Sequence, residues 1–117
     1  MQPTPKVSRD DVERIVRRDF PSSEFVNVVA VLDKYGSGKW HRERERVQVA
    51  VLKLAKGKMD ALRREIENAK CDYREVIAPA EYPKYSKRFA NRKLPSEEQE
   101  RIFAQDWKQY EDWFNAK

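Results

Sequence analysis

"RERERVQVAVLKL", residues 42–54, decides the fold class, because its letters are compatible with both a strand and a helix. β-Branched residues such as valine favour strands, and "FVNVVAVL", residues 25–32, is equally rich in them. In a strand, Arg42, Arg44 and Arg46 would share one face, and the two glutamates between them would share the other. In a helix, each glutamate lies three residues from an arginine, a pairing that contributes about 0.2–0.5 kcal/mol. The alternating charges therefore favour a helix.

The apolar residues that follow these charges point to the same structure. They recur at the i, i+3, i+4 and i+7 spacing of one helix face, and they are Val47, Ala50, Val51 and Leu54. Gly57 stands where a glycine commonly ends a helix. We therefore predict an α-helix over this segment. A β-hairpin that pairs residues 25–32 with 47–54 is the alternative, and it would make the fold α+β.

Start and stop signals predict helices in the first third of the chain. Ser8 followed by Asp11 is a capping signal, and a helix that begins there should stop near Phe20, because Pro21 disfavours helical geometry in the residue before it. The valine-rich segment that follows has apolar residues at helical spacing. Gly36 should end that second helix.

The second half of the chain has clearer periodicity. Residues 59–78 carry an apolar residue every three or four positions, which predicts one amphipathic helix of about five turns that Pro79 ends or kinks. Ser96 with Gln99 forms a capping-box signature, and it opens a C-terminal helix. The aromatic stripe of that last helix is Phe103, Trp107, Tyr110 and Phe114.

The composition agrees with a helical domain. The chain has 117 residues, of which 38% are charged, and only three glycines. So many charges suit helices with one apolar face and one solvated face, whereas a β-sandwich needs many glycine-bearing turns. We predict a compact all-α single domain, residues 1–117, built as a bundle of about five helices. Residues 82–95 should form an irregular basic connector before the last helix.

One long stretch has a family resemblance. "ERVQVAVLKLAKGKMDALRREIENAKCDYREVIAPAEYP" resembles sequences of small bacterial helical proteins of unassigned function, over about residues 43–83. The stretch contains no catalytic signature, so the resemblance implies a helical fold and no particular activity or site residue.

Residues that commonly carry catalysis or bind metals are scarce. The chain has one cysteine, Cys71, and one histidine, His41, and these cannot complete a tetrahedral metal site. "KYGSGKW", residues 34–40, lacks the glycine spacing and the hydroxyl of a phosphate-binding loop. We therefore predict that the protein is not an enzyme and has no metal and no cofactor.

The sequence also bears on location. The longest apolar run, residues 28–32, is far shorter than the ~20 residues that span a bilayer. The N-terminus has no apolar segment of the kind that begins a secretory signal, and a lone cysteine fits a reducing compartment. We predict a cytoplasmic protein with no membrane association.

Residues 82–93, here called the basic segment, are one candidate site. The segment has five basic residues and no acidic residue, and cations with interleaved aromatic rings are typical of sites for single-stranded nucleic acid. The same residues can also form only a solvated connector. The candidate anion- or partner-binding residues are Tyr82, Lys84, Tyr85, Lys87, Arg88, Phe89, Arg92 and Lys93.

The aromatic face of the C-terminal helix is the other candidate site. Trp113 lies beside Phe114 and widens the apolar face that includes Trp107, so part of this face can remain exposed for a partner. We predict a non-enzymatic protein–protein interaction or regulatory module, which binds an unknown protein partner or itself. Cations of the basic segment would attract an acidic partner. Nucleic-acid binding through the basic segment is the alternative function.

Overall fold

Both valine-rich segments are helices in the computed structural model, which describes residues 4–36, 38, 43–89 and 96–117, the side chains of 87–89 excepted. The described residues contain no strand, so the hairpin alternative is not supported and the protein is an all-α single domain. A 3-10 turn, Ser22–Glu24, precedes the second helix. The helices are α1 (Arg9–Asp19), α2 (Phe25–Leu32), α3 (Arg44–Ala55), α4 (Met59–Cys71), α5 (Arg74–Glu81), α6 (Pro83–Phe89) and α7 (Ser96–Asn115).

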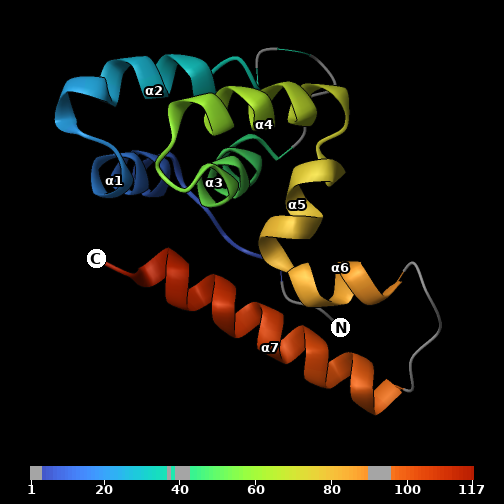
Figure 1. Cartoon of the computed structure of the whole chain (residues 1–117). Coiled ribbons are helices and arrows are strands. Elements are labelled where there is room, and N and C mark those ends of the chain that lie inside the picture. Colours follow the sequence, from blue (N-terminus) through green and yellow to red (C-terminus); the bar gives the residue numbers. More distant parts are fainter. Residues whose placement is uncertain (1–3, 37, 39–42, 90–95) are drawn as a thin grey trace.

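Helices α1 to α4 form the body of the molecule, and α5 and α6 form an arm that α7 packs against. Figure 1 shows α1 to α4 gathered together, α5 leading away from them to α6, and α7, drawn in red, lying along the far side. Helix α3 packs against α1, α4 and α5, whereas α7 packs against α5 and α6. Helix α5 therefore links α3 to α6 and α7, and Arg14 and Arg18 of α1 form a second link to the last turn of α7.

Helix α3 is the centre of the core, and this resolves the conflict in its sequence. Six consecutive residues, Val47–Leu52, have no exposed surface, because other helices cover every side of this part of α3. A helix surrounded in this way can be apolar all round, so its valines need no strand to be buried. The predicted stripe was too narrow, since Gln48, Val49 and Leu52 are buried as well and Leu54 is only half-buried.

The N-terminal helix begins as the sequence predicts. The Ser8 side chain accepts a hydrogen bond from the Asp11 backbone N–H, and the Asp11 carboxylate accepts one from the Ser8 backbone N–H. This reciprocal pair satisfies two N–H groups that have no partner within the helix. The capping signal is thus confirmed, and it fixes where the chain turns from residues 4–7 into α1.

A buried ion pair joins α3 to α5. Arg46 donates from Nε and Nη2 to the two carboxylate oxygens of Glu81, each at 2.7 Å, and from Nη1 to Glu43 at 2.9 Å. The Glu81 side chain is only 3% exposed and that of Arg46 is 18% exposed. Two parallel bonds to one carboxylate give a strong, oriented pair, and the hydrogen bonds to Glu81 raise the pKa of Arg46.

The helix predicted over residues 59–78 is two helices, α4 and α5. The chain is extended at Asp72, whose carboxylate accepts a hydrogen bond from the backbone N–H of Arg74 at 3.0 Å. An aspartate at such a position offers the backbone an alternative to continuing the helix. Pro79 does not end α5, which continues to Glu81. Pro79 and Glu75 are exposed, so water can bond the Glu75 carbonyl that lacks its helical donor.

The prediction of an irregular connector over residues 82–95 is wrong for its first half, because Pro83–Phe89 forms α6. Proline is favoured at the first helical position, where no backbone N–H is needed. The N–H groups of Lys84 and Tyr85 find their acceptor on α7, in the carboxylate of Asp106. Residues 90–95 lie outside the described residues. The break after Cys71 and the addition of α6 raise the count from about five helices to seven in the described part of the chain.

The buried ion pair yields a stability prediction. Arg46→Met leaves the Glu81 carboxylate buried without its partner, so we expect the free energy of unfolding to fall by about 3–5 kcal/mol. Arg46→Met/Glu81→Leu removes both charges, and we expect it to recover most of that loss. Urea denaturation measures both variants. A double variant as unstable as Arg46→Met would contradict this account of the pair.

Candidate functional site

Helix α7 presents one buried face and a row of aromatic side chains along its edge. Ile102, Asp106 and Tyr110 recur every four residues and are buried, which is the pattern of a helix packed on one side. The aromatic side chains beside them are half-buried, and these are Phe103, Trp107, Trp113 and Phe114. Tyr110 therefore belongs to the core, and the other aromatic rings lie at its border.

Asp106 fixes α7 to the start of α6. Its side chain has no exposed surface, and its two carboxylate oxygens accept hydrogen bonds from the backbone N–H groups of Lys84 at 3.1 Å and Tyr85 at 3.0 Å. Negative charge at a helix N-terminus is favourable, and the bonds satisfy donors that α6 cannot satisfy itself. Asp106 also acts on Lys53 of α3. Burial and the charge of Lys56 lower the pKa of Lys53, whereas the charge of Asp106 raises it.

Further hydrogen bonds fix the C-terminal half of α7 to α5 and α1. Gln109 donates from Nε2 to the carbonyl oxygens of Ala80 at 3.3 Å and Glu81 at 3.4 Å, at the end of α5. One turn further along α7, Arg18 donates to the carbonyl of Trp113 at 2.7 Å and Arg14 to that of Phe114 at 2.9 Å. These carbonyls belong to the last turn of α7, where helical partners are missing.

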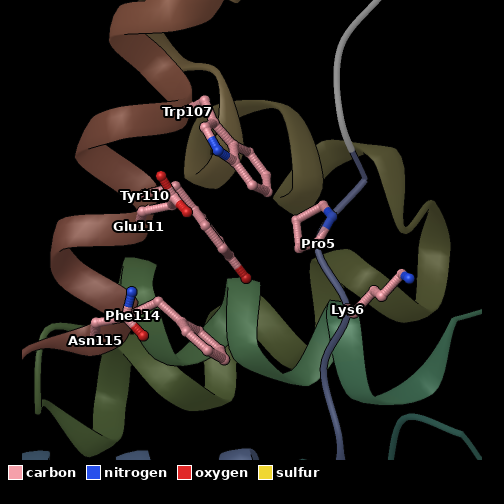
Figure 2. A pocket seen from close by; sticks show the side chains of 7 residues that line it. All are labelled: Pro5, Lys6, Trp107, Tyr110, Glu111, Phe114 and Asn115. Carbon is pink, nitrogen blue, oxygen red and sulfur yellow. The ribbon is translucent and has the colours of Figure 1, made fainter.

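A small pocket lies between α7 and residues 4–7, here called the N-terminal segment. Its volume is about 180 Å³. Figure 2 shows Trp107, Tyr110 and Phe114 extending from one side of α7, with Pro5 of the N-terminal segment turned toward them. Lys6 also belongs to the lining, and its side chain extends away from the rings. The rest of the lining comes from α7 and is polar, namely Glu111 and Asn115. The small pocket is therefore an apolar hollow with polar groups around it.

The aromatic rings of the small pocket support one another. The rings of Trp107 and Tyr110 are stacked with centroids 6.1 Å apart, and those of Tyr110 and Phe114 are stacked at 5.9 Å. Offset stacking at such distances stabilises aromatic pairs by about 0.5–1.5 kcal/mol. Tyr110 is the central ring and is only 2% exposed. It therefore fixes the positions of the two rings that flank it.

The hydroxyl of Tyr110 is buried and has no hydrogen-bond partner among the described residues. Burial raises the pKa of Tyr110, and the nearby Glu81 carboxylate raises it further, so the phenol keeps its proton. A buried polar group without a partner costs about 1–3 kcal/mol. Tyr110 therefore contributes packing to the wall of the small pocket, at the expense of an unsatisfied hydroxyl.

The structure places only some of the residues predicted in the basic segment. Lys84 is exposed and donates from Nζ to the Gln105 side chain at 2.9 Å. The Tyr85 ring packs on Phe103 with centroids 4.2 Å apart, and Tyr82 meets Tyr85 edge to face at 6.5 Å. Lys87, Arg88 and Phe89 follow on α6, where only the backbone is described. Arg92 and Lys93 lie outside the described residues.

The three predicted interface residues of α7 have different surroundings. Trp107 borders the small pocket. The ring of Trp113 lies beneath the Arg18 guanidinium, 4.9 Å from its centroid, and that of Phe114 lies 5.0 Å from the Arg14 guanidinium. Trp113 also packs against the core. Phe114 packs against the core as well. Both Trp113 and Phe114 therefore join α7 to α1, and Phe114 also lines the small pocket with Trp107.

The arginines of α1 were not among the predicted site residues. Arg14, Arg17 and Arg18 line a second, larger pocket of about 630 Å³ at the C-terminal end of α7. Their i, i+3, i+4 spacing places them on one helix face, and this was the available signal. A count of charge along the chain hides it, because four acidic residues flank these three arginines within residues 10–19.

No family model matches the chain, and neither the curated proteins nor the solved structures give a match. No helix in the described part of the chain is long and apolar enough to cross a membrane. The described residues also contain no group of three or more His, Cys, Asp or Glu side chains that could hold a metal ion. The candidate site must therefore be interpreted from its own geometry.

The unsatisfied hydroxyl predicts that its removal stabilises the protein. Tyr110→Phe keeps the ring and removes the buried hydroxyl, so we expect the free energy of unfolding to rise by about 1 kcal/mol. Chemical denaturation measures the change. Tyr73→Phe, at a half-buried tyrosine, is the matched control and should change stability by less than about 0.5 kcal/mol. A loss of stability in Tyr110→Phe would show that the hydroxyl is hydrogen-bonded.

Proposed function

We propose that this chain is a non-enzymatic protein–protein interaction module, which receives an apolar side chain of a partner in the small pocket between α7 and the N-terminal segment. The observation that carries the proposal is that pocket, which the half-buried rings of Trp107 and Phe114 line together with Pro5. Figure 2 shows Trp107 facing Pro5 across it. Aromatic residues that border an apolar pocket are typical anchors of protein interfaces.

The dimensions of the small pocket fit one anchor side chain. A cavity of about 150 Å³ holds a benzene molecule, so a pocket of about 180 Å³ has room for the side chain of a leucine or phenylalanine. Burial of such a side chain contributes about 1.5–3 kcal/mol. That is one contact of an interface, so the partner must also cover the surface around the pocket.

The wall of the small pocket is held in place before any partner binds. The hydrogen bonds of Asp106 and Gln109 fix α7 to α6 and α5, and the α1 arginines fix its C-terminal end. A surface that is already ordered loses little conformational entropy when it binds. The rings can therefore contribute most of their contact energy to affinity.

The surroundings of the small pocket also suit a protein partner. Lys6 and Glu111 are exposed at its border and carry opposite charges, and Asn115 adds an amide. Protein interfaces commonly combine an apolar centre with a polar rim. A polar rim of mixed sign can pair with charged side chains of either sign, and it orients the partner around its anchor.

Truncation of one ring tests the proposal. We expect immobilised Trp107→Ala to capture, from a lysate of the native host, at least tenfold less of a partner that the unaltered protein captures. Quantitative mass spectrometry measures the captured proteins. Phe103→Ala is the matched control, because it truncates a half-buried ring on the same helix that packs on Tyr85 instead of lining the small pocket.

The control separates loss of the pocket from loss of the fold. Both variants should remain helical by circular dichroism, and Phe103→Ala should still capture the partner. Sedimentation velocity of the unaltered protein shows whether that partner is a second copy of the chain. If Trp107→Ala captures the same proteins in the same amounts, or if the unaltered protein captures none, the proposal is wrong.

A further inference from the structure

The arginines that line the larger pocket, Arg14, Arg17 and Arg18, are here called the arginine cluster. We infer that the arginine cluster binds carboxylates of an acidic peptide segment whose apolar anchor occupies the small pocket. This inference rests on the proposed function, and it adds the chemistry of the partner. The larger pocket has a volume of about 630 Å³ and is lined by these arginines, Lys117 and one acidic residue, Asp11.

Each arginine of the cluster is oriented by an aromatic ring. The guanidinium of Arg14 lies 5.0 Å from the centroid of Phe114, that of Arg17 lies 4.5 Å from Phe25, and that of Arg18 lies 4.9 Å from Trp113. The N–H groups of a guanidinium lie in its own plane. When the guanidinium stacks on a ring, these groups point outward past the ring edge and can still donate hydrogen bonds. The cations are thus held in position beside the pocket.

Arg14 and Arg17 retain donors for a ligand. A guanidinium has five N–H groups. In the part of the chain that the structure describes, Arg14 donates one hydrogen bond, to the Phe114 carbonyl, and Arg17 donates none. Their nearest carboxylates, on Asp11 and Glu13, are both 3.7 Å away, which is too far for a hydrogen bond.

Arg18 has a different part in the cluster. It donates to the carbonyls of Trp113 and Ala116 and to the Asp19 carboxylate, and its side chain is only 13% exposed. By contrast, the side chains of Arg14 and Arg17 are 42% and 62% exposed. Arg18 therefore supports the end of α7, and Arg14 and Arg17 are the residues that can contact a carboxylate, each through two parallel bonds.

The two pockets adjoin, so one bound segment can fill both. Phe114 and Asn115 line the small pocket and the larger one. Phe114 presents its ring to the small pocket (Figure 2), and the same ring lies beneath the Arg14 guanidinium. An extended peptide that places an apolar side chain in the small pocket therefore passes the arginine cluster within a few residues.

The distribution of charge favours an acidic peptide over a nucleic acid. Residues 94–117 carry six acidic and three basic side chains, and one of these acids, Glu111, is exposed and lines the small pocket. A continuous phosphate backbone would be repelled by these carboxylates. A peptide with a few acidic residues can place its carboxylates at the larger pocket, where the arginine cluster and Lys117 outnumber the one acidic lining residue, Asp11.

Selection from a phage-displayed library of random peptides tests the inference. The full chain is the bait, and we expect the enriched peptides to combine one leucine or aromatic residue with neighbouring aspartates or glutamates. In a fluorescence anisotropy titration of one enriched peptide, replacement of its acids by the matching amides should weaken binding about tenfold at low salt. That difference should shrink as the salt concentration rises.

A matched pair of variants locates the effect. Arg17→Gln removes a cation that donates no hydrogen bond among the described residues, so the fold should be retained, and we expect the selected peptide to bind about threefold to tenfold more weakly. Arg64→Gln removes the same charge from α4, where the side chain is 67% exposed, and should leave the affinity unchanged. Equal losses in both variants would overturn the inference, because general attraction would then account for them.

The outcomes separate this inference from the proposed function. If the enriched peptides are apolar, lack acidic residues and bind Arg17→Gln with unchanged affinity, the inference is wrong and the proposed function is unaffected. Enriched acidic peptides that bind Trp107→Ala as tightly as the unaltered protein overturn the proposed function. A random single-stranded oligonucleotide that displaces the selected peptide overturns the choice of a peptide. A selection that enriches no peptide overturns both proposals.

Discussion

The ends of a helix expose backbone groups that need hydrogen-bond partners, and in this fold side chains of other helices supply many of them. Gln48 donates to the carbonyls of Leu32 at 2.9 Å and Tyr35 at 3.1 Å, after the end of α2. Asp106 accepts hydrogen bonds from the first N–H groups of α6, and Gln109 donates to the Ala80 carbonyl near the end of α5. Among the described residues the buried side chains that carry an amide or a carboxylate are Gln48, Glu81 and Asp106. Each of them acts at a helix end, so the polar groups of the core determine how the helices are joined.

This constraint also explains how a charged chain with few glycines builds a binding surface. Helix α7 contacts the arm along its length and α1 only through its C-terminal end. The N-terminal segment runs beside α7, and the small pocket lies between them (Figure 2). Because α7 is fixed by bonds at several points, its half-buried rings are presented to solvent without the freedom to collapse into the core. The hydrogen bonds that join the helices thus also support the proposed site.

Local signals in the sequence predict the all-α class, the capping box at Ser8 and the aromatic face of α7, because each depends on residues within one or two turns. The α6 helix was not predicted, since the acceptor of its first N–H groups is Asp106, more than twenty residues away in the chain. The small pocket was missed for the same reason, because it combines Pro5 with residues of α7. The arginine cluster is visible only when α1 is projected as a helix, because a count of charge along the chain hides it. The apolar spacing of α3 could not show that six consecutive residues would be enclosed, since other helices cover them.

Hydrogen exchange of the α6 amides tests most directly whether side chains of other helices hold this fold together. NMR-detected exchange would compare the unaltered protein with Asp106→Ala, and the amides of α3 provide the internal reference. We expect the Lys84 and Tyr85 amides to be protected in the unaltered protein and to exchange at least tenfold faster in the variant, while the α3 amides change less. Equal protection of Lys84 and Tyr85 in both proteins would show that α6 forms without Asp106, and the central claim would then be wrong.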